Sequence, residues 1–276
     1  MKKFEGVLIC TDLDGTLLNE ERRISKENLE AIRYFQREGG FFTFVTGRTP
    51  YSARPLYEMI HPNAPVGCGN GGGIYDYQRE AYLYMQELSH DAMELVDHAL
   101  QQIPGMGVQL HTPECVYFAS ENEATEHSLR VTGLPRRICS HKSFEKKLLK
   151  VVFCDTDMTR INALGALFQA HPKKEDFHFV RSEDFLYEIL PKGSNKGVLV
   201  LKLAELLGID PSKTIAVGDY NNDVEMIRDA GIGIAVSNAV PEAKAVADLI
   251  TVSNEENAIA KIIWDLDSGA LKFSEN

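Results

Sequence analysis

Residues 6–16 read GVLICTDLDGT, and this stretch decides the fold. The apolar run at residues 6–10 predicts a buried strand, which ends in a polar turn that carries Asp12 and Asp14. In a parallel sheet, ligands bind beyond the carboxyl ends of the strands, where Gly15 allows the backbone to turn sharply. One carboxylate there can attack phosphorus while the other handles the proton of the leaving group. A D-x-D pair alone is more often a plain acidic turn, whereas the whole string directly after a strand favours catalysis.

Apolar runs that end in small polar turns recur, with helical patterns between them. Residues 25–38 predict an amphipathic helix that Ser25 caps and Gly39 ends, and residues 41–45 predict the next strand. The last third of the chain continues the alternation, with helices over 196–207, 222–230, 241–247 and 255–266 and strands over 214–218, 232–236 and 249–252. Strands that alternate with helices indicate βαβ units and a parallel sheet, so the predicted fold class is α/β.

The middle of the chain has a different pattern. Residues 74–77 and 81–88 flank a short polar turn and predict a hairpin. Beyond the hairpin, helical stretches at 91–102, 122–131 and 158–170 mix with short strands at 107–111, 115–119, 148–154, 177–181 and 185–190. This stretch is long enough for a domain of its own. We therefore predict a core made of residues 1–88 and 191–276, with residues 89–190 inserted as an α+β domain.

The composition is that of an ordinary globular protein, and it limits the partners. Of the 276 residues, 25% are charged, and the formal net charge is −11. Nucleic acids and anionic membranes need a basic face, so we expect neither as a partner, and the sequence specifies no oligomeric state. No apolar run is long enough for the core of a signal peptide or for a spanning helix. The five cysteines are scattered and odd in number, which favours reduced thiols in a cytoplasmic protein.

A second acidic segment, GDYNND at 218–223, directly follows an apolar strand. Mg²⁺ prefers hard oxygen ligands, usually one or two carboxylates with waters and phosphate oxygens. Asp219 is the natural ligand in this segment, together with Asp12 and the backbone carbonyl of Asp14. An asparagine of the segment can also cap the next helix, and that role is compatible with catalysis.

Two weaker signals complete a phosphate site. Thr46 and Gly47 follow the strand at 41–45 and offer a hydroxyl and an unhindered N–H to phosphate oxygens. A lone lysine is usually a solvated charge, but Lys196 opens a helix where the chain returns from the insertion, which makes it a candidate for neutralising phosphate. The glycine-rich segment 67–72 fits G-x-G-x-x-G, yet a strand-like sequence follows it instead of a helix, so dinucleotide binding is rejected.

Taken in order, these segments resemble the haloacid dehalogenase (HAD) superfamily, specifically its Cof-type phosphatases. The four signature positions are DLDGT at 12–16, TGR at 46–48, Lys196, and GDYNND at 218–223. Further matches cover most of the chain: Asn70-Gly71-Gly72 before the hairpin, Pro191-Lys192-Gly193 before the lysine, Ser237-Asn238-Ala239, and ADLIT at 247–251. Tyr220 and Gly72 are small departures, because the family usually has a smaller residue and an alanine at these positions.

The resemblance implies a Rossmann-like core with a large α+β cap, and it implies a role for each signature residue. Asp12 would be the nucleophile that becomes phosphorylated, and Asp14 the general acid and then the general base. The phosphate would be surrounded by the N–H of Leu13, the Thr46 hydroxyl, the Gly47 N–H, Lys196 and the Asn222 amide. Mg²⁺ would be held by Asp12, the Asp14 carbonyl and Asp219, with Asp223 bound to it directly or through water.

The predicted activity is Mg²⁺-dependent hydrolysis of a small phosphorylated metabolite through an aspartyl-phosphate intermediate. Similar enzymes serve sugar phosphates, FMN and pyridoxal phosphate, and the residues of the cap select among them. A phosphomutase shares the same motifs, so this alternative stays open. A non-catalytic sugar-phosphate sensor is disfavoured, because such a protein would lack Asp12 or Asp219.

Overall fold

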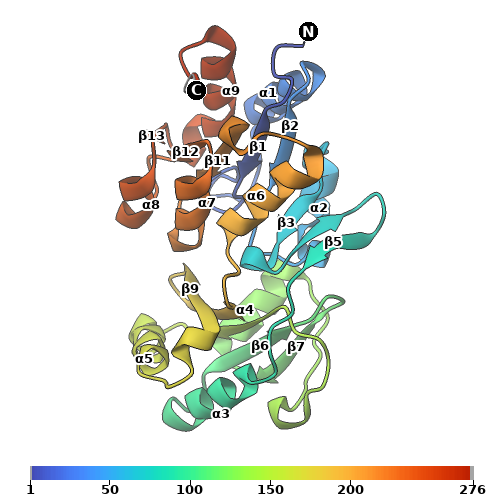
Figure 1. Cartoon of the computed structure of the whole chain (residues 1–276). Coiled ribbons are helices and arrows are strands. Elements are labelled where there is room, and N and C mark those ends of the chain that lie inside the picture. Colours follow the sequence, from blue (N-terminus) through green and yellow to red (C-terminus); the bar gives the residue numbers. More distant parts are fainter. Residues whose placement is uncertain (1, 274–276) are drawn as a thin grey trace. The chain divides into compact units, whose positions relative to one another are not determined.

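The structure is a computed structural model that describes residues 2–273, and the chain divides into two compact units. The first unit contains Met1–Thr46, Pro55–Leu83 and Asn195–Asn276, and the second contains Gly47–Arg54 and Tyr84–Ser194. The insertion predicted at 89–190 lies inside the longer stretch of the second unit. Figure 1 shows that each unit has its own sheet and helices. Within the described range, no helix is both long and apolar enough to cross a membrane.

The first unit is built on a five-stranded sheet in the order β13-β12-β11-β1-β2. Its strands are β1 (Leu8–Thr11), β2 (Phe41–Phe44), β11 (Thr214–Gly218), β12 (Ile232–Ala235) and β13 (Leu249–Ile250). Each neighbouring pair is parallel, which confirms the predicted α/β class. All four residues of β1 are buried, as expected for a strand in the middle of a sheet that is covered on both faces.

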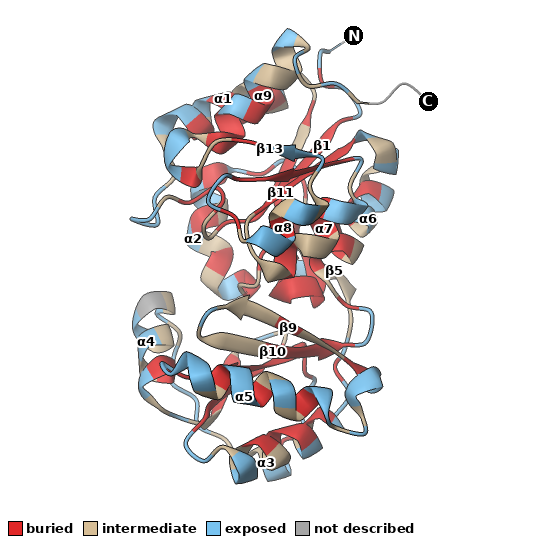
Figure 2. Cartoon of the chain, turned by 90° about the vertical axis from the view of Figure 1, so that its left-hand side faces the viewer, coloured by how far each residue is buried: buried red, intermediate tan, exposed pale blue. Residues whose placement is uncertain are grey.

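Helices cover both faces of this parallel sheet (Figure 2). On one side α1 (Lys26–Arg37) packs against α9 (Ala258–Ser268), and on the other lie α6 (Lys196–Leu207), α7 (Val224–Asp229) and α8 (Pro241–Val246). Helix α1 begins where predicted, because the Ser25 hydroxyl accepts a hydrogen bond of 3.1 Å from the Asn28 N–H. Its buried stripe includes Ile32 and Phe35.

A three-stranded sheet completes the first unit, in the order β3-β4-β5. These strands are β3 (Val66–Cys68), β4 (Gly73–Asp76) and β5 (Ala81–Met85), so β4 and β5 are neighbours, as the predicted hairpin requires. The glycine-rich segment forms a tight turn between β3 and β4, and Gly69, Asn70 and Gly71 all have positive φ angles. No helix follows this turn, which agrees with the rejection of a dinucleotide fingerprint.

The second unit has an antiparallel sheet in the order β7-β6-β8-β10-β9. Its elements are α3 (Ala92–Gln102), β6 (Gly107–His111), β7 (Val116–Ser120), α4 (Glu123–Thr132), β8 (Lys150–Cys154), α5 (Met158–Gln169), β9 (Phe177–Glu183) and β10 (Leu186–Pro191). Helices α3 and α5 lie on the same side of the sheet (Figure 2). Their apolar faces and one face of the sheet form a hydrophobic core within this unit.

Three helices depart from the sequence prediction. The helix expected at 222–230 starts as a 3-10 turn, Asn221–Asp223, and becomes α-helical only at Val224. The helix expected from 255 is α-helical only from Ala258, because Asn257 has a φ of 62° and separates it from a preceding 3-10 turn. Helix α2 (Pro50–Ile60) was not predicted, and Pro55 lies inside it. Proline weakens a helical pattern in sequence because it removes a hydrogen-bond donor.

Candidate active site

Asp12 and Asp219 lie side by side because they follow two neighbouring parallel strands. In the β1–β11 pair, Thr11 is opposite Val217, and the Asp12 N–H donates to the Val217 carbonyl at 2.8 Å. Asp12 directly follows β1, and Asp219 directly follows β11. The carboxyl edge of the sheet therefore brings together two carboxylates that are far apart in the sequence.

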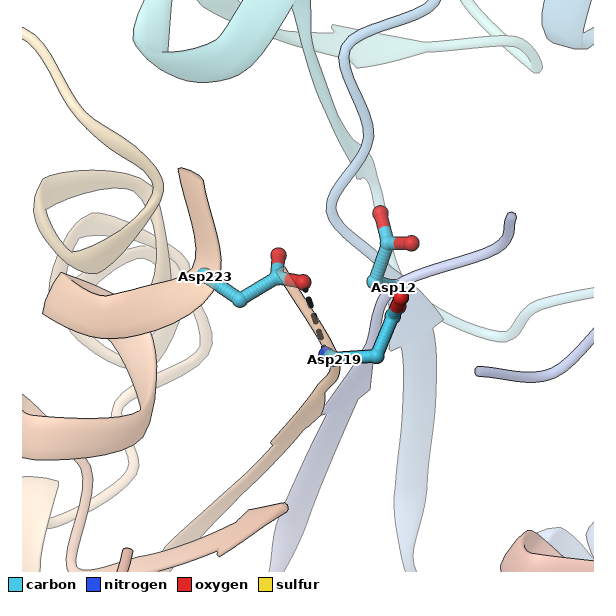
Figure 3. A group of neighbouring side chains, drawn as sticks. All are labelled: Asp12, Asp219 and Asp223. Carbon is cyan, nitrogen blue, oxygen red and sulfur yellow. Dashed lines mark hydrogen bonds between the residues drawn. The ribbon is translucent and has the colours of Figure 1, made fainter. Parts of the chain in front are cut away.

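Asp223 joins these two carboxylates from the turn after Asp219 (Figure 3). Asp12, Asp219 and Asp223 each contribute one oxygen to a cluster in which these atoms all lie within 4.8 Å of one another. In the described part of the chain this is the one group of three or more metal-ligand side chains that are so close. Asp14, the fourth predicted carboxylate, is half-buried on the same turn as Asp12.

Lys196 is the positive charge of the cluster. It is the first residue of α6 and is only 1% exposed. Its ammonium group donates to Asp12 Oδ1 at 2.6 Å and to Asp223 Oδ1 at 2.5 Å. The Asn195 side chain caps α6 by accepting from the Val198 N–H at 2.9 Å. This cap fixes the start of the helix and therefore the backbone position of Lys196, its first residue.

Backbone hydrogen bonds to Asp223 close the turn around the cluster. Asp223 Oδ2 accepts from the N–H groups of Asp219 and Tyr220 at 2.9 and 3.0 Å. The first of these bonds is drawn in Figure 3. Since Asp223 Oδ1 accepts from Lys196, both oxygens of this carboxylate have partners within the protein. Asp223 therefore orients both the lysine and the loop that carries Asp219.

The turn after Asp12 approaches Asp219 closely. Gly15 has a φ of +83°, and a Cβ at this position would lie 2.5 Å from Asp219 Oδ2. Thr16 donates its hydroxyl hydrogen to Asp219 Oδ1 at 2.6 Å. Only glycine allows both the left-handed backbone and this close approach. The DLDGT motif thus shapes the cluster through its glycine and threonine as well as through its aspartates.

Asn70 links two of the predicted phosphate ligands, Thr46 and Asn222. Thr46 is buried, and its carbonyl accepts from the Asn70 N–H at 3.1 Å. Asn222 donates one amide hydrogen to Asn70 Oδ1 at 3.0 Å. Leu13 is buried in the first motif, and Gly47 opens the short stretch of the second unit. The roles of these residues toward phosphate stay predictions.

Burial and charge repulsion shift the ionisation of the cluster. Burial, with repulsion from Asp223, Asp219 and Asp14, raises the pKa of Asp12 well above its ordinary value despite the attraction of Lys196. Burial and Asp223 raise the pKa of Asp219 to about 7, although the hydrogen bond from Thr16 opposes this. For Lys196, burial lowers the pKa, but Asp12 and Asp223 outweigh it and the net shift is upward. One ammonium thus faces several carboxylates, and this excess of negative oxygen ligands suits Mg²⁺.

The sequence profile of haloacid dehalogenase-like hydrolases matches residues 9–263. The chain belongs to this family. Two relatives of this HAD-like hydrolase are the 5-amino-6-(5-phospho-D-ribitylamino)uracil phosphatases YcsE and YwtE of Bacillus subtilis, which are 31% and 30% identical to it. The alignments cover 93% and 95% of this chain, and 94% and 98% of the relatives. The Cof-type assignment made from the motifs is confirmed.

Solved structures show the same fold. A haloacid dehalogenase-like hydrolase from Bacteroides thetaiotaomicron superposes with a TM-score of 0.81 at 23% identity, and the match covers 94% of this chain and 99% of that one. At this level of identity the likeness shows the fold alone.

Sequence reasoning named the charged residues of the site but gave no role to three neighbours. Thr16 binds Asp219, Asn70 joins Thr46 to Asn222, and Asn238 donates to the Gly15 carbonyl at 2.8 Å. Each belongs to a short motif that the HAD resemblance quotes. Position in a motif was therefore the available signal, while the hydrogen-bond partner came only from the fold.

Proposed function

We propose that this HAD-like hydrolase is a Mg²⁺-dependent phosphatase that acts through a phosphorylated aspartate. The observation that carries the proposal is the pairing of Lys196 with Asp12 beside Asp219, at the carboxyl edge of the sheet. A nucleophilic carboxylate next to a lysine and to spare carboxylate oxygens is what phosphoryl transfer needs. Asp12, Asp219 and the Asp14 carbonyl would hold Mg²⁺, with Asp223 orienting the loop. Mg²⁺ would neutralise charge on the phosphate oxygens.

The reaction divides into two steps. An oxygen of Asp12 attacks phosphorus, the bond from phosphorus to the ester oxygen breaks, and Asp14 gives its proton to the leaving oxygen. Asp14, now a carboxylate, takes a proton from water, whose oxygen attacks the same phosphorus. The bond between phosphorus and Asp12 then breaks, which releases inorganic phosphate and restores the enzyme. Lys196 stays protonated and offsets negative charge on the phosphoryl group.

The substrate is a small phosphate monoester. The relatives YcsE and YwtE are named for a substrate with a phosphorylated ribityl chain, which is a sugar alcohol. This favours sugar phosphates and phosphorylated ribityl compounds over pyridoxal phosphate. Inorganic phosphate released into solution distinguishes a phosphatase from a phosphomutase, which returns the phosphoryl group to its substrate. Loss of all turnover in EDTA distinguishes both from a protein that only binds the ester.

The roles of the two aspartates can be separated with nitrophenyl phosphate. Nitrophenolate leaves without an acid, so the Asp14→Asn variant should release about one equivalent and then stall as phosphorylated Asp12. An Asp12→Asn variant should show no burst. Rapid mixing followed by intact-mass measurement reads both results. Steady turnover by Asp14→Asn, or phosphate found on another residue, would contradict these roles.

A further inference from the structure

Asn70, in the tight turn between β3 and β4 of the first unit, has an unusual backbone conformation. Its φ and ψ angles are 55° and 31°, in the left-handed region, and the residue is only 1% exposed. This conformation costs free energy for a residue with a side chain, although asparagine tolerates it better than most. Glycine adopts it freely and stands on both sides, as Gly69 and Gly71. A buried side chain kept between two glycines indicates a role for that side chain.

The backbone of this turn holds Thr46, a predicted phosphate ligand of the same unit. The Thr46 N–H donates to the Gly67 carbonyl at 3.0 Å, and the Asn70 N–H donates to the Thr46 carbonyl at 3.1 Å. A parallel bridge between Val45 and Gly67 precedes these bonds, just after β2 ends. Both backbone groups of Thr46 are therefore bonded to the segment that leads into and includes Asn70. The turn thus lies at the same edge of the sheet as the predicted phosphate site.

The side chain of Asn70 reaches a second predicted phosphate ligand, Asn222. Asn222 Nδ2 donates to Asn70 Oδ1 at 3.0 Å, and both residues are buried. Asn222 directly precedes Asp223, the carboxylate that accepts from Lys196. The bond to Asn70 sets which way the Asn222 amide faces, because an amide oxygen in place of its NH₂ group would meet Asn70 Oδ1, another acceptor. An NH₂ group has two hydrogens, so one binds Asn70 and the second can be donated to a phosphate oxygen.

We propose that Asn70 is a positioning residue for phosphate, because it holds the Asn222 amide with its NH₂ group toward the ligand. This inference rests on the proposed phosphatase function. Without the Asn70 side chain, the Asn222 amide is free to turn over and present its oxygen. An ionised phosphate oxygen has no hydrogen to share with that oxygen, so the contact becomes repulsive. Asn70 thus acts through Asn222, and its effect on phosphate depends on that amide.

The first test is Asn70→Gly, which removes the side chain but keeps the left-handed backbone and the N–H that binds Thr46. With Mg²⁺ present, the inhibition constant of inorganic phosphate against nitrophenyl phosphate should rise about tenfold, because a buried amide loses its partner. Mg²⁺ affinity measured by calorimetry without phosphate should not change. Asn257→Gly is the matched control: Asn257 has a φ of 62° and its side chain makes no capping bond, so phosphate inhibition should stay the same. An unchanged inhibition constant in Asn70→Gly, or an equal loss of Mg²⁺ affinity, would overturn the proposal.

The second test is a double-mutant cycle with Asn222→Ala. This variant alone should raise the inhibition constant of phosphate about tenfold or more, because it removes the donor itself. Adding Asn70→Gly should then cause no further rise, since no amide is left to orient. Effects that multiply in the double variant would show that Asn70 acts by another route, which overturns the inference and leaves the phosphatase function standing. Absence of ester hydrolysis by the unchanged protein with Mg²⁺ would overturn both.

Discussion

At the scale of single residues, the site depends on a few positions that orient the charged groups. Asp223 was predicted to bind the metal directly or through water, and its two oxygens accept from Lys196 and from the N–H groups of Asp219 and Tyr220. These contacts therefore hold the ammonium group of Lys196 in place, together with the loop that carries Asp219, a proposed metal ligand. Gly15 acts from the other side of the cluster, since its missing side chain makes room for Asp219.

Gly15→Ala tests this close approach. The new methyl group would lie 2.5 Å from Asp219 Oδ2, so the carboxylate must move. We expect Mg²⁺ affinity and kcat to fall about tenfold or more, because small displacements of ligands and reacting groups are costly. Isothermal titration with Mg²⁺ and phosphate release would measure the two effects.

Gly6→Ala is the matched control for the backbone strain. Gly6 has a φ of +80°, close to that of Gly15, but a Cβ there would meet nothing within 4 Å. Both variants should lose about 1–2 kcal/mol of stability from the left-handed conformation. Only Gly15→Ala should lose activity. Equal activity in the two variants would show that the contact with Asp219 does not matter.

At the scale of elements, strand order and helix caps bring the site together. Strands β1 and β11 are separated by about 200 residues of sequence yet are neighbours in the sheet, so Asp12 and Asp219 meet at its edge. Helix α6 brings its first residue, Lys196, to the same place, and its position depends on the Asn195 cap. A change in this cap should therefore affect chemistry as well as stability.

Asn195→Ala tests the cap of α6. Loss of an N-cap side chain costs about 1 kcal/mol of stability. We expect kcat to fall about tenfold as well, because the cap no longer holds the backbone of Lys196, the residue that follows it. Ser25→Ala removes the corresponding cap of α1, and should cost similar stability without changing kcat. Melting curves and phosphate release would be compared. An unchanged kcat in Asn195→Ala would mean that Asp12 and Asp223 suffice to orient the lysine.

Elements with a strong local pattern were predictable from the sequence, and those with a weak pattern were not. The strand at 107–111 and the start of α5 at 158 were predicted at the observed residues, because apolar spacing marks them directly. The helix at 50–60 was missed because Pro55 lies inside it. The buried ion pair of Lys150 and Glu188 was also missed. Polar residues that alternate along a strand suggest a solvated face, and only the fold shows that these two are buried.

At the scale of the whole molecule, two units with separate cores divide the proposed work. The proposed catalytic carboxylates and Lys196 belong to the first unit, while the buried ion pair of Lys150 and Glu188 belongs to the second. The core of the second unit is built from its own helices and strands. We therefore propose that residues 89–190 select the substrate and that the parallel-sheet unit performs the chemistry.

Exchange of the insertion tests this division. Replacing residues 89–190 with the matching range of a relative that has a different substrate should transfer the preference for phosphate esters. The requirement for Mg²⁺ and the phosphorylation of Asp12 should remain, since their residues lie outside the exchanged range. A panel of phosphate esters and intact-mass measurement would read both properties. Preference that stays with the original parallel-sheet unit would contradict the division.

The charge of the cluster also makes the stability of the whole molecule depend on pH and on Mg²⁺. Without metal, the pKa of Asp219 is raised to about 7, so the folded state keeps a proton that the unfolded state, with a carboxyl pKa of about 4, has already lost. This contribution to stability is complete below about pH 4 and is lost as the pH rises through about 7. Mg²⁺ competes with this proton, so its binding should strengthen over the same range.

Melting temperatures measured with Mg²⁺ and with EDTA test this coupling. The rise in melting temperature caused by Mg²⁺ should be small near pH 5.5 and several degrees larger near pH 8. The reason is that stabilisation by a ligand grows with the logarithm of its concentration divided by its dissociation constant. Asp219→Asn removes both the titrating group and a proposed ligand, so its melting temperature should respond weakly to Mg²⁺ at either pH. Ca²⁺ and Mg²⁺ compared at pH 8 would show whether the small octahedral ion is preferred. The same response to Mg²⁺ at both pH values in the unchanged protein would mean that protons and metal do not compete at Asp219, and the proposed metal ligands would then have to lie elsewhere.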